Sequence, residues 1–545
     1  MAQQLVGSRK QRNLRTICSE VLLLLVSAFV LSLAFPGFAT KNGLGFLAFV
    51  ALIPVFVVIH RTTWAWTPFY GFFFGFMYYL FFNYWLKAFH PLAILIVPII
   101  KGGEMLLLFP CLKAADKWFK KYGFLVQAVV WTAYSYLSQS WFAGYPYGTI
   151  AYALWQYLPL IQIASVTGIW GINFMMVLPQ AFLAVPLAKK GRIRDHIVAE
   201  KVSCIVYAVL AAVCVLFGII TMHQCRTAPL ERTWRVATVQ HNANSWVGGY
   251  TTYKRNFNNL RKMSLEAMEQ KPDMLVWSET AFVPSVAWHE SYPSDPNTSA
   301  LVEEFTAFGK SLSVPLLTGN PEGVLDDPTK PAILEDGSWN RKDYNTVIMF
   351  ENGEIKGTYR KQHLVPFTEH FPYQKQMPHL YALLKANDYH WWEKGTESVV
   401  FETDDGIKFS TPICFEDVYG DINAAFVRNG ADVLINMTND NWSQSVASEM
   451  QHMAMAVFRS VENRRTMVRG TNSGMTCVIT PEGKVVDPME PFKAGWHVYE
   501  VPVYNQGFTF YTRHGDYFAR IMVLLSALCL LSGAVVRVKN RKKEV

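Results

Sequence analysis

The amino-acid sequence predicts a multi-span α-helical membrane bundle of about eight helices joined to an α/β extramembrane domain. Residues 17–221 are almost continuously apolar, whereas residues 226–515 have the mixed composition of a soluble protein. Only 17% of the 545 residues are charged, against about 25% in ordinary soluble domains. The predicted organisation is a transmembrane domain at 1–222, a globular domain at 223–517, and a final helix with a basic tail at 518–545.

Apolar segments that could cross a membrane recur along the chain. A hydrocarbon core requires roughly 20 mainly apolar helical residues. Eight segments approach this length, at 17–36, 43–60, 66–88, 92–111, 122–139, 160–188, 202–222 and 518–536. Because six further spans follow the first one before the globular domain, we interpret residues 17–36 as a membrane helix and not as a cleaved signal. In the fourth segment Lys101 and Glu104 are expected to pair, since lone charges are costly in lipid.

The positions of lysine and arginine predict the topology. With the N-terminus inside, nineteen of these residues fall in inside segments and only Lys41 and Lys87 fall in the short outside loops. The positive-inside rule therefore places both termini in the cytoplasm, and seven helices then deliver the globular domain to the opposite side. This topology accounts for the net charge of +8 and argues against a nucleic-acid partner.

The segment at 140–159 is uncharged, aromatic and interrupted by glycine and proline. Tryptophan and tyrosine suit the headgroup region of a bilayer. The segment is therefore predicted to be an interfacial or re-entrant loop on the outer side of the membrane. A plain belt of aromatic side chains is an equally good interpretation.

The polar region alternates short β-branched runs with helical patterns. Strands are expected at 235–240, 273–279, 314–320, 344–350, 409–416, 432–438 and 475–480, and helices at 251–270, 298–312, 418–429 and 446–464. Strands separated by helices predict sheets that are covered on their faces. The eight cysteines form no C-x-x-C pair and no cluster with histidine, so no disulfide framework and no metal site are expected.

Three residues at expected strand ends form a candidate catalytic set. They are Glu279 in "VWSETAF", Lys361 in "YRKQHLVPFTEHFP" and Cys414 in "STPICFEDVYG". Taken singly, they are also typical of a helix-capping acid, a solvated lysine and a packed core cysteine. Together they supply what a thiol of pKa about 8.5 needs in order to act as a nucleophile, namely a base and a nearby cation. Glu279 can accept the thiol proton, and Lys361 can stabilise the thiolate and then the oxyanion of an acyl transfer.

Neighbouring residues complete this candidate site. The backbone N–H of Phe415 is a candidate second donor to the oxyanion. Glu369 and Glu416 can keep the lysine charged and oriented. His363 and His370 flank the lysine without an evident partner acid, so we interpret them as surface histidines.

The three residues and their surroundings resemble the nitrilase, or carbon–nitrogen hydrolase, superfamily, whose catalytic set is Glu, Lys and Cys in that order. The resemblance covers about 233–505 through "WSET", "YNT", "RKQHLVPFTEHFP", "CFED", "NMTNDNW" and "RRTMVRGTNSGMT". Within that superfamily the chain is similar to the apolipoprotein N-acyltransferase family. The arrangement of seven spans before the domain and one after it, the block "GYPYG…GIWGINF" at 144–174, and "QHMAMAVFRSVENRR" at 451–465 carry this closer resemblance.

The resemblance implies a four-layer αββα sandwich on the periplasmic side of a bacterial inner membrane. It also implies a reaction in which Cys414 takes the sn-1 acyl chain of a phospholipid, typically phosphatidylethanolamine, as a thioester. The α-amino group of a diacylglyceryl-cysteine on an apolipoprotein would then accept the chain as an amide. Glu279 is implied as the base, Lys361 as the oxyanion stabiliser, and no cofactor is implied. A membrane-tethered amidase or nitrilase, with water as acceptor, is the alternative.

Candidate substrate contacts follow from the same resemblance, with departures from the family pattern. Phe367 is implied as an apolar element near the pocket. Phe415 stands where relatives usually carry tyrosine. The stretch "NDNWSQS", which holds the candidate contacts Asn439 and Trp442, lacks the usual glycine. Trp246 is the nearest match to a substrate-loop tryptophan, with its spacing shifted by a few residues.

Overall fold

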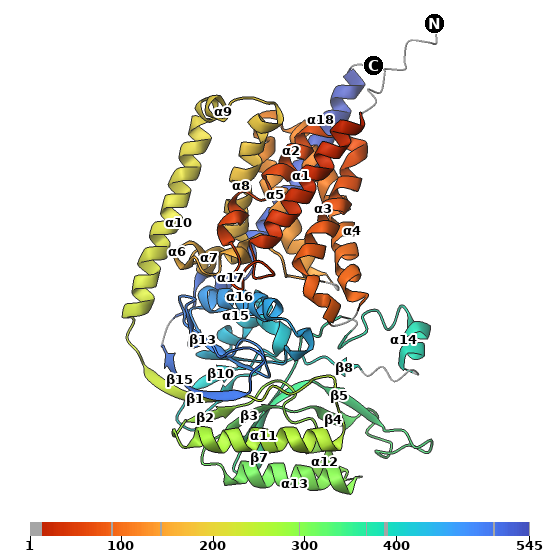
Figure 1. Cartoon of the computed structure of the whole chain (residues 1–545), viewed down its shortest axis with the longest axis vertical. Helices are drawn as coiled ribbons and strands as arrows, with labels where there is room; N and C mark the ends of the chain where they lie inside the picture. The colour runs from red at the N-terminus through yellow and green to blue at the C-terminus, as the bar shows by residue number, and fades with distance from the viewer. Residues whose placement is uncertain are drawn as a thin grey trace. The chain divides into compact units, whose positions relative to one another are not determined.

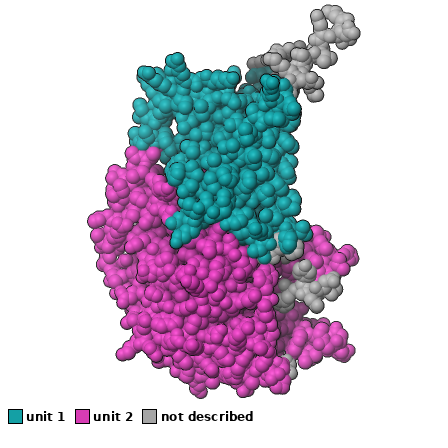
Figure 2. Space-filling model, viewed as in Figure 1, with its two compact units in different colours: residues 1–135, 173–209, 520–545 teal, residues 136–172, 210–519 magenta. Residues whose placement is uncertain are grey.

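The computed structural model describes residues 13–88, 91–141, 144–293, 295–366, 368–385, 391–504 and 507–543. The chain divides into two compact units, which Figure 2 distinguishes by colour. The first comprises residues 1–135, 173–209 and 520–545, and the second comprises residues 136–172 and 210–519. The aromatic segment that begins at residue 140 therefore belongs to the same unit as the globular region.

The first unit is built from apolar helices, some of which continue into residues of the second unit. Five described helices are long and apolar enough to cross a membrane: α1 (Leu14–Leu33), α4 (Ala93–Trp118), α8 (Ile169–Ala188), α10 (Lys201–Thr227) and α18 (Tyr517–Lys543, apolar over Tyr517–Asn540). Of the other three predicted spans, 66–88 and 122–139 overlap α3 (Thr67–Phe82) and α5 (Gly123–Ser140). The predicted span at 43–60 instead divides into a 3₁₀ segment (Gly45–Phe49) and the short helix α2 (Ile53–Arg61). Helix α9 (Ile193–Ala199) precedes α10.

Close packing of α3 on α4 depends on glycine. A Cβ on Gly71 would lie 2.1 Å from the carbonyl oxygen of Met105, so the two helix backbones can approach only at a residue without a side chain. The expected pairing in α4 is confirmed, because Lys101 Nζ lies 3.1 Å from Glu104 Oε2 and Tyr134 also donates to this carboxylate.

The second unit contains two six-stranded sheets (Figure 1). The first sheet has the order β15 (Gly495–Val503), β1 (Arg232–Gln240), β2 (Met274–Val276), β3 (Leu316–Gly319), β6 (Thr346–Glu351), β7 (Glu354–Arg360). The second has the order β14 (Val485–Val486), β13 (Cys477–Ile479), β12 (Thr466–Thr471), β11 (Val433–Thr438), β10 (Lys408–Ser410), β9 (Phe401–Glu402). A small third sheet joins β4 (Glu322–Leu325), β5 (Arg341–Tyr344) and β8 (Trp392–Glu393).

Helices cover the outer faces of the two large sheets, which contact each other through β1, β12 and β15 (Figure 1). Helices α11 (Tyr250–Met268) and α13 (Pro296–Ser311) pack on the first sheet around Phe257, Trp277 and Phe305. Helices α15 (Gly420–Arg428) and α16 (Val446–Asn463) lie on the side of the second sheet. Strands β11 and β12 are buried along their whole length, as expected of parallel strands between two covered faces. The layers therefore run helix, sheet, sheet, helix.

The remaining helices are short. They are α6 (Leu158–Ile161), α7 (Ala164–Thr167), α12 (Val286–Ser291), α14 (Pro378–Lys385) and α17 (Phe510–His514).

The predicted strand at 409–416 is wrong in its second half. Strand β10 ends at Ser410, and a 3₁₀ helix runs from Cys414 to Val418. Pro412 supplies the physical reason, because a proline has no N–H to donate to a sheet ladder. The early end of the strand leaves the half-buried Cys414 at the start of a turn.

Candidate active site

Glu279, Lys361 and Cys414 follow strands β2, β7 and β10, so two sheets contribute to one site. Lys361 Nζ lies 3.2 Å from Glu279 Oε1. Cys414 lies close enough to both that the charge of Glu279 raises the pKa of its thiol and the charge of Lys361 lowers it. The structure thus brings together the three residues that the sequence singled out.

The Lys361 ammonium is fully buried and paired with two carboxylates. Its second partner is Glu369 Oε1, at 2.8 Å. Burial alone would lower the pKa of Lys361, but the charges of Glu279 and Glu369 outweigh it and hold the pKa well above its usual range. The lysine therefore remains a cation, as a group that stabilises an oxyanion must.

The Glu279 carboxylate is held at both oxygens. Its Oε1 accepts from Lys361 and, at 2.8 Å, from Asn345 Nδ2. Its Oε2 accepts from the backbone N–H of Asn439 at 2.9 Å. These bonds leave little freedom for the carboxylate to rotate, which favours a base aimed at one proton donor.

Gly319 in β3 makes room for the backbone at Glu279. A Cβ at this position would lie 2.2 Å from the N atom of Thr280 and 2.7 Å from Cα of Glu279. Real side chains do not tolerate such distances, so glycine is required for Glu279 to sit where it does.

Cys414 has the left-handed backbone conformation, with φ of +48°. A residue other than glycine persists in this conformation only where surrounding contacts hold it. Asn436 on β11 provides such contacts, because its Nδ2 donates to the carbonyl oxygens of Pro412 and Cys414, each at 3.1 Å. Phe415 follows in the first turn of the 3₁₀ helix, where N–H groups have no acceptor within the helix.

The Cys414 thiol requires activation. Burial, and then the charge of Glu279, raise the pKa of Cys414 well above its usual range, and the opposing effect of Lys361 is smaller. The thiol is consequently protonated at neutral pH and can become a nucleophile only as a base removes its proton.

Glu416 acts differently from the expectation that it orients the lysine. It accepts backbone N–H groups from Ile413 at 2.8 Å, Gln362 at 2.7 Å and His363 at 2.9 Å, together with the hydroxyl of Tyr359. Burial raises its pKa to about 7. Glu416 thus ties the Cys414 turn to the segment that follows Lys361, while Glu369 contacts the ammonium directly.

The candidate substrate contacts lie at different depths. Trp246 is 56% exposed and Trp442 is half-buried. The Asn439 side chain accepts from Ser245 Oγ at 2.8 Å, so the loop that holds Glu279 also contacts the segment that carries Trp246. Phe367 lies outside the described residues.

His363 is not the surface histidine that the sequence indicated. Its ring centroid lies 3.8 Å from that of Tyr419, and burial, followed by the charges of Lys394 and Lys361, lowers its pKa to about 4. It is therefore a neutral packing partner of the segment that follows the Cys414 turn.

The aromatic segment contributes a residue that sequence reasoning missed. The ring of Tyr147 stacks on that of Phe415 at 6.1 Å and lies 6.4 Å from that of His452. Tyr419 OH also donates to the carbonyl oxygen of Gly144 at 3.3 Å. Residues 144–155 of the segment are buried or half-buried, which a belt of aromatic side chains alone does not account for. In the sequence, the absence of charged residues from this segment is the feature that could have indicated its burial.

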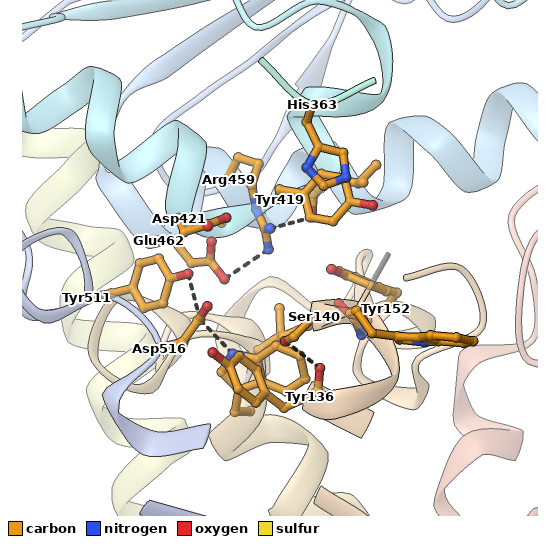
Figure 3. A pocket seen from close by; sticks show the side chains of 16 residues that line it. Tyr136, Ser140, Tyr152, His363, Tyr419, Asp421, Arg459, Glu462, Tyr511 and Asp516 are labelled. Atoms are coloured by element: carbon orange, nitrogen blue, oxygen red, sulfur yellow. Dashed lines mark hydrogen bonds and ion pairs between the residues drawn. The ribbon is translucent and has the colours of Figure 1, made fainter. Parts of the chain in front are cut away.

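A polar cavity of about 290 Å³ lies at the far end of the Cys414 turn (Figure 3). Its described lining includes Val418 and Tyr419 of that segment, but none of Glu279, Lys361 and Cys414. The buried Arg459 lies at its wall, with Nη1 donating to the carbonyl oxygen of Val418 at 2.7 Å and Nη2 to Glu462 at 2.9 Å. This arginine fixes the end of the turn whose beginning carries the thiol.

Two sheets flanked by helices, with Glu279, Lys361 and Cys414 at strand ends, define a carbon–nitrogen hydrolase domain attached to apolar helices. Residues 235–503 match the carbon-nitrogen hydrolase family, and residues 27–182 match the apolipoprotein N-acyltransferase N-terminal domain. The chain belongs to the apolipoprotein N-acyltransferase family, as the resemblance predicted.

Two full-length relatives support this assignment. The chain is 38% identical to apolipoprotein N-acyltransferase 1 of Treponema denticola, covering 94% of this chain and 96% of the relative. It is 35% identical to apolipoprotein N-acyltransferase 1 of Treponema pallidum, covering 96% of both chains. Among solved structures, Nit3 of Saccharomyces cerevisiae, a member of the nitrilase superfamily, covers 50% of this chain and 91% of its own, with 20% identity and a TM-score of 0.35.

Proposed function

We propose that this protein transfers the sn-1 acyl chain of a phospholipid, by way of a thioester on Cys414, to the α-amino group of a diacylated apolipoprotein. The observation that carries the proposal is the buried Lys361–Glu279 pair beside a protonated thiol. The names of the full-length relatives supply the acceptor.

The first half-reaction forms the thioester. The Cys414 sulfur attacks the ester carbonyl carbon while Glu279 accepts the thiol proton. The Lys361 ammonium and the Phe415 N–H donate to the oxyanion of the tetrahedral intermediate. When this intermediate collapses, the bond to the glycerol oxygen breaks and Glu279 returns the proton to that oxygen, which releases lysophospholipid.

The second half-reaction transfers the chain. The neutral α-amino group attacks the thioester carbonyl, and the oxyanion again forms against Lys361 and the Phe415 N–H. As the C–S bond breaks, Glu279 accepts the proton from the nitrogen and passes it to the Cys414 sulfur. The products are the amide and the resting thiol, and no cofactor enters either step.

The membrane part presents both lipid substrates. We propose eight spans, of which α2, α3 and α5 are the three shorter or less apolar ones, with both termini in the cytoplasm. Residues 223–517 then face the periplasm from the inner membrane. Extracting an acyl chain into water costs about 0.8 kcal/mol per CH₂, so an enzyme anchored in the bilayer avoids a large penalty. Phosphatidylethanolamine is the proposed donor.

One experiment separates acyl transfer from hydrolysis. The purified full chain is incubated in detergent micelles with phosphatidylethanolamine labelled in the sn-1 chain, with and without a diacylated lipopeptide. Label in a triacylated peptide supports the proposal. Label released only as free fatty acid, with the lipopeptide unchanged, contradicts it and supports a membrane-tethered amidase. A lipopeptide acetylated on its α-amino group is the matched control and should accept no label.

A further inference from the structure

A buried histidine lies between two aspartates beneath the site. His452 on α16 is 2% exposed. Its Nε2 lies 2.7 Å from Asp417 Oδ1, and its Nδ1 lies 3.0 Å from Asp440 Oδ1. Both ring nitrogens therefore face carboxylate oxygens.

The two aspartates belong to the two segments whose relative position sets the distance between the nucleophile and the base. Asp417 lies in the 3₁₀ turn that begins at Cys414. Asp440 follows Asn439, whose backbone N–H donates to Glu279 Oε2. The imidazole of His452 thus bridges the turn that carries the nucleophile and the loop that holds the base.

The charges around the ring indicate an imidazolium. Arg469 on β12 pairs with Asp417 and lies 3.7 Å from Asp440 Oδ2, so a charged histidine balances two carboxylates with two cations. Burial alone would lower the pKa of His452, but Asp417 and Asp440 raise it to about 9. Only the imidazolium can donate from both nitrogens at once, because a neutral ring has one donor and one acceptor.

Two other titratable groups lie near His452 or its partner aspartates. Tyr147 approaches from the aromatic segment, and burial raises the pKa of its phenol well above the usual range. Glu449 lies on α16 itself and accepts from Ser443 Oγ at 2.8 Å. Burial, and then the charge of Asp440, raise the pKa of Glu449 well above its usual range.

We propose that the His452 imidazolium is a positioning residue that locks the Cys414 turn to the loop holding Glu279. Loss of the ring proton leaves one aspartate facing a lone pair instead of a donor, and the turn and the loop then separate. Misplacement of reacting groups by about 1 Å costs on the order of 100-fold in rate. His452 is buried, and the proposal assigns it no contact with substrate, so the substrate affinity is not expected to change.

The test compares His452→Gln with wild type and with His289→Gln, a matched change on α12. The proposal rests on the proposed acyl transfer, so two readouts are used. One is the rate of thioester formation from labelled phosphatidylethanolamine together with its KM. The other is the rate at which iodoacetamide alkylates Cys414, followed by peptide mass spectrometry, which requires no acyl substrate.

For His452→Gln we expect thioester formation and alkylation to slow by about 10- to 100-fold, with KM changed by less than about two-fold. His289→Gln should match wild type. Equal rates in His452→Gln and wild type, measured on folded protein, would overturn the proposal. A wild-type enzyme that is alkylated at Cys414 but forms no thioester would instead count against the proposed function.

The pH profile provides a second, independent arm. Wild-type thioester formation should fall as pH rises through about 9, where His452 loses its proton. The Lys361 ammonium does not explain such a fall, because its pKa lies higher. Asp440→Asn removes one charge that raises the His452 pKa, so the fall should move toward neutral pH. If His452→Gln does not fold, the pH profile of Asp440→Asn tests the proposal by itself. An unchanged profile in Asp440→Asn overturns the proposal.

Discussion

Lys361 Nζ lies 3.2 Å from Glu279 Oε1, although the two residues are 82 positions apart in the sequence. This pair gives the site its chemical character. The ammonium fixes the position of the carboxylate oxygen that it contacts, and in the proposed reaction it also stabilises the negative charge that develops on a substrate oxygen. The pair lies in a buried environment, where such interactions are stronger than in water.

Substitution of Lys361 tests what its ion pair with Glu279 contributes to stability and to rate. Lys361→Ala leaves the buried Glu279 and the half-buried Glu369 without their partner, which costs about 3–5 kcal/mol of folding stability. Loss of an oxyanion donor lowers the rate of acyl transfer by a further 10²- to 10³-fold, approximately. Thermal unfolding in detergent and thioester formation measure the two effects. Lys310→Ala, on the exposed face of α13, should change neither; a Lys361→Ala enzyme with normal turnover would contradict the assigned role.

Asn345 orients both carboxylates around the lysine. Its Nδ2 donates to Glu279 at 2.8 Å and to Glu369 at 3.3 Å. Asn345→Asp keeps the shape of the side chain but replaces these donated bonds with repulsion between carboxylates. Thioester formation should fall by roughly 100-fold, the scale of a misplaced reacting group. Asn429→Asp is the control, at an exposed asparagine whose Nδ2 donates only to a backbone carbonyl oxygen, that of Ser398, among the described contacts; similar losses in both variants would show a nonspecific effect.

Substitution of Gly319 tests whether the position of the Glu279 side chain depends on close backbone packing at β3. A methyl group there meets the backbone of Thr280 and Glu279, so Gly319→Ala must displace the base. We expect a loss of about 1–3 kcal/mol in stability, typical of overpacking, and a lower kcat. Gly507→Ala, where a Cβ meets nothing within 4 Å, should be neutral. Unaltered thermal unfolding and kcat in Gly319→Ala would refute this account of β3.

Glu416 predicts a dependence of stability on pH. Burial raises the pKa of Glu416 to about 7 in the folded protein, above the usual value of 4.5 that applies in the unfolded chain. Between these values the folded state binds more protons, so its stability falls as pH rises from about 4.5 to 7, by roughly 3 kcal/mol. Glu416→Gln removes the titrating group. The difference in melting temperature between pH 5 and pH 7 should therefore be smaller in the variant, and an equal difference would exclude Glu416 as the source.

The sequence predicted the features that depend on local pattern. Alternating strand and helix patterns predicted the α/β domain because buried strands and amphipathic helices have different hydrophobic periods. The intramembrane pair of Lys101 and Glu104 followed from the cost of lone charges. Glu279, Lys361 and Cys414 could be named together because their chemistry is complementary, even though the contacts among them depend on two separate sheets.

Other features depend on contacts between distant segments and could not be predicted. The pairing of His452 with Asp417 and Asp440 needs three elements to converge, and a histidine on an apolar helix carries no sign of such partners. His363 was placed at the surface because its packing partner, Tyr419, is remote in sequence. The position of Tyr147 beside Phe415 likewise depends on how the aromatic segment folds onto the α/β domain.

The central claim is that Cys414 carries the acyl chain. The most direct measurement is peptide mass spectrometry of the full-length enzyme after incubation with phosphatidylethanolamine alone. We predict one acyl group on the peptide containing Cys414, removed by neutral hydroxylamine, absent in Cys414→Ser and retained in Cys477→Ser, where the cysteine is a buried residue of β13. An acyl group that persists in Cys414→Ser, or that maps to another residue, would contradict the account.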